Sequence, residues 1–227
     1  MNGRKFLHRI LNRQSPDRLL WTTLVDDVTR SVMPDEVRRL SALEFYRHIG
    51  CDIVQLGNYG LSQDMCVPSP SRLVSPDVKQ EIAGEDGNPL PDLEAELGGN
   101  EIAIGTGGPT VNRTVQLRRV TPWGTLTTLL KHDHPVEHPV KTVEDMRILR
   151  AIWEASNYVE CQGMEEAFAR VESCIGDDGI YVPWLDPSPV QNLLEYEMGA
   201  ANFYYLLDDH REEMEQLLAV MHAKRLQ

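Results

Sequence analysis

The sequence predicts an α/β fold, namely a TIM-type (β/α)8 barrel that is incomplete and carries an antiparallel β insertion. Two observations predict it. Short apolar segments of strand length alternate with amphipathic helices, which is the order typical of parallel βαβ units. A long stretch at residues 61–142 then breaks this order, because it is rich in Pro and Gly and has no helical periodicity. We expect a single domain over residues 1–227, with the insertion at 61–142 inside it.

The first 60 residues predict two helical regions and two strands. Apolar residues recur at helical spacing over residues 3–13, which indicates a first helix. The run at 19–25 is continuously apolar or β-branched, as in strands buried on both faces, and is interpreted as the first barrel strand. A capping box at 41–44 favours a helix over about 35–49, either continuous or broken before Ser41. The apolar run at 51–57 is then the second parallel strand.

Within the insertion we expect antiparallel strands. Short alternating stretches occur at 78–82, 101–104 and 114–121. The sequence Thr121-Pro122-Trp123-Gly124 places Pro and Gly at the second and fourth positions of a tight turn. This turn is predicted to join 114–121 to 124–131 as a hairpin.

Helical signals return after the insertion. Acidic residues, capping residues and apolar stripes mark successive helices, and one further apolar run marks a third parallel strand. The elements expected are a helix beginning at Thr142, a helix over 163–174, a strand at 179–185, a helix from Ser188 to Gly199, a short helix over 201–207, and a last helix after Asp209.

The strand count indicates that the barrel is incomplete. Without the insertion about 145 residues remain, whereas a complete barrel typically needs about 250. A sheet of three apolar parallel strands would also leave an edge that invites aggregation. The last helix reaches Gln227 without a capping glycine. We therefore expect the 227 residues alone to be inactive and poorly behaved, and the full-length protein to be an enzyme.

Composition excludes several classes of protein. The net charge is −13, and no cluster of Lys and Arg interrupts the acidity, so nucleic acid is not an expected partner. Neither an apolar run of about 18 residues nor a signal peptide is visible, so we expect a cytoplasmic protein without a membrane partner. The four cysteines form no CxxC pair and are read as free thiols.

Four segments together carry a resemblance to a known family. They are Ser15-Pro16-Asp17-Arg18, Thr121-Pro122-Trp123-Gly124-Thr125-Leu126, Glu137-His138-Pro139-Val140-Lys141, and Pro187-Ser188-Pro189 through Gly199. In order and spacing, over nearly the whole chain, they resemble the uroporphyrinogen decarboxylase superfamily. That superfamily includes porphyrinogen decarboxylases and the cobalamin- and zinc-dependent methyltransferases that feed coenzyme M. Each motif alone is weak, whereas the series is fairly specific.

The resemblance implies a (β/α)8 barrel whose site lies at the carboxyl ends of the strands. The candidate catalytic residues are Asn58, Asp26 and Tyr196, and the candidate substrate-binding residues are Trp21, Asp27, Arg30 and Trp184. For the aspartates and Asn58, the alternative is helix capping or loop hydrogen bonding. For the two tryptophans the alternative is core packing, and Arg30 can instead pair with Asp35 or Glu36.

Three departures separate the chain from the decarboxylase branch. That branch has arginines after its first strand, which suit the carboxylates of its substrate, whereas this chain has Asp26 and Asp27 before Arg30. Its aspartate after the second strand falls at Asn58. Its tyrosine after the third strand falls near Glu195, so that Tyr196 is turned about 100° around the helix.

These departures favour a methylcobalamin-dependent, methyltransferase-like enzyme acting on a corrinoid, a tetrapyrrole or another small molecule, with a corrinoid protein as a further partner. The alternatives are a porphyrinogen carboxy-lyase and a non-catalytic fragment or binding module. No cofactor site is visible in this sequence, although the resemblance implies zinc and a corrinoid for the full-length protein. A His-x-Cys pair and a later Cys downstream would support zinc. The cluster of His132, Asp133, His134 and His138 is read as a surface loop rather than a metal site.

Overall fold

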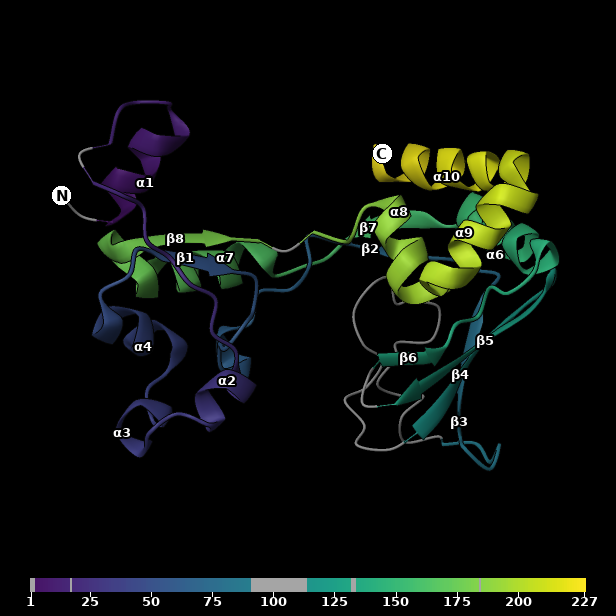
Figure 1. The fold of residues 1–227 in the computed structure, drawn as a ribbon, viewed down its shortest axis with the longest axis horizontal. Coiled ribbons are helices and arrows are strands. Elements are labelled where there is room, and N and C mark those ends of the chain that lie inside the picture. Colours follow the sequence, from purple (N-terminus) through teal and green to yellow (C-terminus); the bar gives the residue numbers. More distant parts are fainter. Residues whose placement is uncertain (1–2, 17, 91–113, 132–133, 184) are drawn as a thin grey trace. The chain divides into compact units, whose positions relative to one another are not determined.

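The computed structural model of the chain describes residues 3–16, 18–90, 114–131, 134–183 and 185–227. The chain divides into two compact units, each built from two separate stretches of sequence (Figure 1). Unit 1 comprises Met1–Pro70 and Cys161–Leu185, and unit 2 comprises Ser71–Glu160 and Asp186–Gln227.

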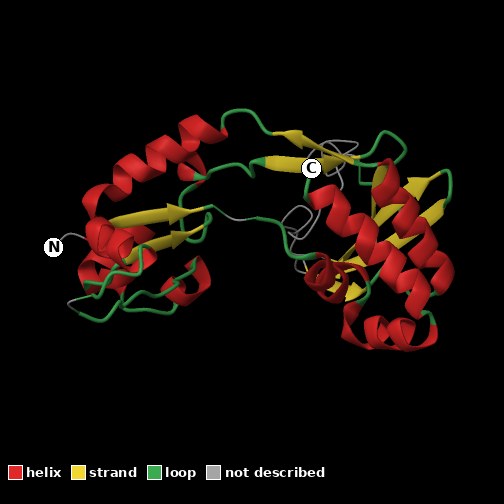
Figure 2. Ribbon diagram, turned by 90° about the horizontal axis from the view of Figure 1, so that it is seen from above, coloured by secondary structure: helices red, strands yellow, loops and turns green. Residues whose placement is uncertain are grey.

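Unit 1 is built around one pair of parallel strands with helices on both sides (Figure 2). Its pairing register aligns Ile53 with Gly179 and Leu56 with Val182. Apolar side chains from α4, α7 and the two strands form its core. The elements are α1 (Gly3–Leu11), α2 (Asp27–Ser31), α3 (Asp35–Arg38), α4 (Ala42–Ile49), β1 (Ile53–Leu56), η1 (Gln63–Met65), α7 (Met164–Ile175), η2 (Gly176–Asp178) and β8 (Gly179–Val182).

Unit 2 combines a four-stranded antiparallel sheet with a group of helices and a second strand pair. The sheet order is β3-β4-β5-β6, and β2 pairs with β7 in antiparallel fashion. The elements are β2 (Ser71–Val74), β3 (Lys79–Gly84), β4 (Thr114–Thr121), β5 (Gly124–Lys131), β6 (His134–Glu137), α6 (Val143–Ala155), β7 (Asn157–Glu160), α8 (Pro189–Asn192), the π-helical turn η3 (Leu193–Glu197), α9 (Gly199–Asp209) and α10 (Arg211–Arg225).

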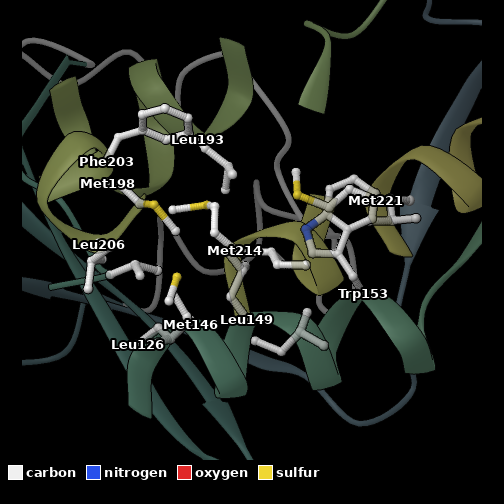
Figure 3. Packing of buried hydrophobic residues seen from close by; sticks show 14 of the residues in the cluster. Leu126, Met146, Leu149, Trp153, Leu193, Met198, Phe203, Leu206, Met214 and Met221 are labelled. Atoms are coloured by element: carbon white, nitrogen blue, oxygen red, sulfur yellow. The ribbon is translucent and has the colours of Figure 1, made fainter. Parts of the chain in front are cut away.

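The core of unit 2 is the larger one and lies between the helices and the sheet. Trp153 and Leu149 of α6 face Met214 and Met221 of α10, while Leu126 extends the cluster to strand β5 (Figure 3). Burial of one such side chain is worth about 1.5–3 kcal/mol, so this cluster is a main source of the stability of unit 2.

The barrel prediction is wrong. The described strands form one four-stranded antiparallel sheet and two two-stranded sheets, and their only parallel pairing is β1 with β8. The second and third predicted strands are thus present and parallel. Most strand residues instead pair with antiparallel neighbours in unit 2.

The predicted first strand, residues 19–25, accounts for much of this difference. The segment has no strand pairing, and Leu19, Trp21 and Leu24 are at least half exposed. One backbone hydrogen bond, from Asp52 N to Trp21 O at 2.7 Å, holds it beside the start of β1. Apolar composition is common to buried strands and to other extended segments, so it did not fix the pairing of this one.

Several local predictions are confirmed. The capping box at Ser41 precedes α4, a second one at Thr142 precedes α6, and Thr121 pairs with Gly124 at the hairpin turn of β4 and β5. The helix expected from Ser188 to Gly199 is different, because α8 runs into a π-helical turn and Gly199 begins α9. The predicted strand at 101–104 lies outside the described residues. Among the described helices, none has the length and apolarity needed to cross a membrane.

Candidate functional site

Residues that were predicted to follow the second parallel strand lie at the carboxyl end of the strand pair in unit 1. In open parallel sheets, ligands bind beyond the carboxyl ends of the strands. Gly57 N donates to Val182 O at 2.8 Å, which extends the pairing one step past β1. The loop that follows, residues 57–67, then returns across this end of the strands.

Asn58 closes that loop with its side chain. Its Nδ2 donates to Val67 O at 2.9 Å, and its Oδ1 accepts from Val67 N at 2.8 Å. The Tyr181 hydroxyl also donates to Oδ1, at 3.3 Å. Both ends of the amide are therefore bonded within the protein, as in the loop-bonding alternative. An aspartate carboxylate at this position could not donate to Val67 O.

Replacing Asn58 by Asp should therefore destabilise unit 1. We expect a loss of about 1–3 kcal/mol at neutral pH, because the Val67 carbonyl loses its donor and faces a carboxylate instead. Urea unfolding followed by circular dichroism measures the change. Asn12→Asp is the matched control, since the Asn12 amide donates to His8 O in an exposed position. An Asn58→Asp variant as stable as that control would show that the Asn58 amide does not clamp the loop.

Tyr181 and Cys66 add two protonated groups to this end of the sheet. Burial raises the pKa of the Tyr181 hydroxyl, and the nearby Cys66 thiol raises it further. Burial also raises the pKa of the Cys66 thiol, with a smaller contribution from Asp64. Both groups are consequently neutral near pH 7 and act as hydrogen-bond donors. The Cys66 thiol is therefore no activated nucleophile in this state.

Gln55 lies beneath these groups, opposite Tyr181 in the strand register. It is fully buried, and its Nε2 donates to Gly57 O at 3.1 Å and to Tyr59 O at 2.8 Å. Its Oε1 has no hydrogen-bond partner among the described residues. Gln55 thus holds the start of the same loop that Asn58 closes.

The predicted residues of the preceding segment adjoin this loop. A Cβ atom added to Gly60 would lie 3.0 Å from Val25 O, so the loop and the segment leading to α2 are in close contact. Asp26 caps α2 by accepting from Thr29 N at 2.6 Å. Arg30 donates through Nη1 to Leu40 O at 2.5 Å. The capping alternative thus describes the Asp26 side chain, while the side chain of Asp27 is not described.

Trp21 lies at the opposite, amino end of β1. The backbone N–H of Trp21 donates to the Asp52 carboxylate at 3.2 Å, and Arg18 forms an ion pair with the same carboxylate. The hydrogen bond from Arg18, followed by that from Trp21 N, holds the pKa of Asp52 below its usual range despite burial. Trp21 is half exposed, which does not fit the core alternative, and its contacts with Asp52 place it at the end of β1 away from Asn58.

The lowered pKa of Asp52 predicts a pH dependence of stability. A carboxyl with a depressed pKa stabilises the folded state above its unfolded value of about 3.9, and this contribution disappears as the pH falls through the folded-state pKa. Asp52→Asn should cost about 1–2 kcal/mol at pH 7 and progressively less below pH ~4. Urea titrations between pH 2 and 7 compare the two proteins. If the difference in stability between the two proteins does not change with pH, the lowered pKa of Asp52 is contradicted.

The last two predicted residues are Trp184 and Tyr196. Trp184 lies outside the described residues. Tyr196 belongs to unit 2, where it lies half-buried on η3. The structure therefore brings the segment of Asp26 and Arg30 against the loop of Asn58, whereas Trp21 lies at the other end of β1.

The sequence interpretation missed Gln55, Cys66 and Tyr181. The signal for Gln55 was a polar residue inside an otherwise apolar strand. The sequence interpretation also missed the buried ion pair in unit 2 between Arg119 and Glu197, which are 78 positions apart in the sequence. No short-range pattern indicates such a pair.

Comparison with known proteins gives no relative: no family model, no curated protein and no solved structure matches the chain. Among the described residues, no group of three or more His, Cys, Asp and Glu side chains is placed to hold a metal ion.

Proposed function

We propose that the chain belongs to a methyltransferase-like enzyme that transfers a methyl group from a corrinoid to a thiol or another small acceptor. The observation that carries this proposal is the ordered series of four segments similar to the uroporphyrinogen decarboxylase superfamily. The proposal concerns the chemistry, and no barrel is part of it.

The packing of unit 2 brings two of those segments together. They are Glu137–Lys141 and Pro187–Gly199, and they meet at η3. Val140 N donates to Glu197 O at 2.9 Å, and the His138 ring lies 3.2 Å from Glu195 O. A Cβ added to Gly199 would lie 2.8 Å from the His138 ring, so the close approach requires glycine there.

The site in unit 1 supports methyl transfer over decarboxylation. Porphyrinogen decarboxylation needs cations for the carboxylates of the substrate and a carboxylate beside the pyrrole nitrogens. Near this end of the sheet, Arg30 bonds to the Leu40 carbonyl and Asn58 is closed onto Val67. The Asn58 amide is neutral, so this position lacks the carboxylate that decarboxylation requires.

The roles of the cofactors follow from their chemistry. A bound corrinoid supplies an activated methyl group, and zinc lowers the pKa of a thiol acceptor. No zinc ligand is assigned to the described residues. Within this proposal, Tyr181 and Asn58 have a positioning role, because they hold the loop at the carboxyl end of the strands in one conformation.

Ligand binding by the chain tests the proposal. Hydroxocobalamin, methylcobalamin and uroporphyrin I would each be titrated against the protein and followed by absorbance and isothermal calorimetry. We expect saturable binding of the two cobalamins and none of uroporphyrin. Asn58→Asp should weaken cobalamin binding more than the exposed Asn12→Asp does.

Two outcomes would overturn the proposal. Turnover of uroporphyrinogen with release of carbon dioxide would establish the carboxy-lyase instead. The preparation must be folded, as judged by circular dichroism. If neither cobalamin binds to it, the non-catalytic binding module is the better description.

A further inference from the structure

The backbone of residues 19–25 in unit 1 bonds to the protein along one edge. Trp21 is held at both of its backbone groups, because its N–H donates to the Asp52 carboxylate at 3.2 Å and its carbonyl accepts from Asp52 N at 2.7 Å. Val25 N donates to the Tyr46 hydroxyl at 3.3 Å. These two residues, four positions apart, therefore turn their backbone groups toward the start of β1 and toward α4.

The residues between them complete an alternating pattern. The backbone of Thr23 bonds to the Cys51 side chain, so it also turns inward. Within the part of the chain that the structure describes, no hydrogen bond engages the backbone of Leu20, Thr22 or Leu24. In an edge strand, every second residue directs its N–H and C=O away from the neighbouring strand. Leu20, Thr22 and Leu24 therefore present a row of unpaired donors and acceptors.

The segment lacks the features that keep a strand edge from pairing. Native edges commonly carry charged side chains, proline or bulges, whereas residues 19–25 contain neither a charge nor a proline. Leu19 is 89% exposed and Leu24 is half exposed. The outer edge of β8 differs, because its Tyr181 N donates to the Glu172 carboxylate at 2.6 Å. The edge at 19–25 is thus the side of this sheet that is open to a further strand.

We propose that this edge pairs with the same segment of a second copy of the chain, antiparallel about a two-fold axis at Thr22. In that register Thr22 is opposite the partner's Thr22 and Leu20 is opposite the partner's Leu24. The three residues with unpaired backbone groups then form hydrogen-bonded pairs that exchange two bonds each. Arg18 is opposite the partner's Asp26, and their opposite charges favour this register. Because the pairing occupies the open edge of both copies, the assembly closes as a dimer.

Sedimentation velocity of the full chain over a range of micromolar concentrations, in about 0.15 M salt, tests the proposal. We expect a dimer whose dissociation constant Thr22→Lys raises at least about fivefold, because two like charges would lie directly opposite each other. Val136→Lys is the matched control, since Val136 is 52% exposed on β6, the edge strand of the sheet in unit 2. It should leave the dimer unchanged. Circular dichroism verifies that both variants are folded.

A milder variant tests the charge pairing. Asp26→Asn keeps a side chain that can cap α2 but removes the charge opposite the partner's Arg18. We expect a smaller loss of affinity than with Thr22→Lys, and a weaker dependence of the association on salt than in the unmodified chain. An unchanged salt dependence would contradict the register.

Disulfide formation tests the register directly. The Cα atoms of a hydrogen-bonded pair are about 5.5 Å apart, which is within the range of a disulfide. On oxidation, Thr22→Cys should link two copies and yield a dimer of the tryptic peptide 19–30, which contains no native cysteine. Leu20→Cys alone should not, because its position is opposite the partner's Leu24. A mixture of Leu20→Cys and Leu24→Cys should link.

Three outcomes would overturn the proposal. A chain that stays monomeric at its highest soluble concentration would leave an extended segment of another protein as the better occupant of this edge. Equal association of the unmodified chain and Thr22→Lys, or loss of the dimer in Val136→Lys, would place the interface elsewhere. Equal linking by Thr22→Cys and Leu20→Cys would show that no single register is formed.

Discussion

Glu197→Gln is expected to destabilise unit 2 by about 3–5 kcal/mol, because it leaves the Arg119 guanidinium charged, buried and without a counterion. The side chains of Arg119 and Glu197 are 7% and 4% exposed, so water cannot replace the lost carboxylate. Thermal and urea unfolding followed by circular dichroism measure the change. The Trp153 ring, buried in the same unit, provides a fluorescence signal for the same transition.

The matched control for this prediction is a surface ion pair in the same unit. Arg147 and Glu213 join α6 to α10 at 2.9 Å, but their side chains are 52% and 28% exposed. Glu213→Gln should therefore change the stability of unit 2 far less than Glu197→Gln does. The double variant Arg119→Met with Glu197→Leu should recover most of the stability lost by Glu197→Gln, since apolar replacement of a buried pair is often neutral. Equal effects of Glu197→Gln and Glu213→Gln would show that burial does not govern the pair.

Local features of the fold were predictable because their determinants are adjacent in the sequence. The capping box of Ser41 and Glu44 forms within one helical turn, and both of its hydrogen bonds are present. The same holds for Thr142 with Asp145, and for the hairpin turn at Thr121 and Gly124. In each case the residue type, its spacing and its bonding partner lie within four positions.

Pairings between distant segments were not predictable in this way. Strand β2 pairs with β7, and their four-residue sequences carry no signal that identifies each other. The run at 19–25 has the composition of a buried strand, yet Leu19 is 89% exposed. Composition describes what a segment tolerates, whereas the choice of a partner strand depends on the whole chain.

The same distinction between local features and distant contacts applies to the candidate site. Asn58 was located correctly at the end of its strand, because the carboxyl end of an apolar run is visible in the sequence. Its bonds to Val67 and Tyr181 were not visible, since Tyr181 is 123 positions away. A polar residue at a strand end therefore indicated a place where groups converge, while the part that its side chain plays depended on the loop that returns to it.

Adding one methyl group at Gly179 should abolish the parallel strand pair that positions this site. A Cβ added to Gly179 would lie 1.9 Å from Ile53 O and 2.7 Å from Ile53 C, which are backbone atoms of the paired strand. Overpacking in a core typically costs about 1–3 kcal/mol when side chains can shift. Here the obstacle is backbone, so we expect Gly179→Ala to cost about 3 kcal/mol or more and to expose the amides of β1 to hydrogen exchange.

Gly163→Ala separates this steric effect from backbone strain. Gly163 has a φ of 79°, and an added Cβ would meet nothing within 4 Å, so only the strain of about 1–2 kcal/mol for a left-handed residue is expected. Hydrogen exchange of the Ile53–Leu56 amides should then remain slow. If Gly179→Ala leaves that protection intact, the register of β1 with β8 is incorrect. The contact between Asn58 and Tyr181 would then be incorrect as well, because the pairing of β1 with β8 places both residues at this end of unit 1.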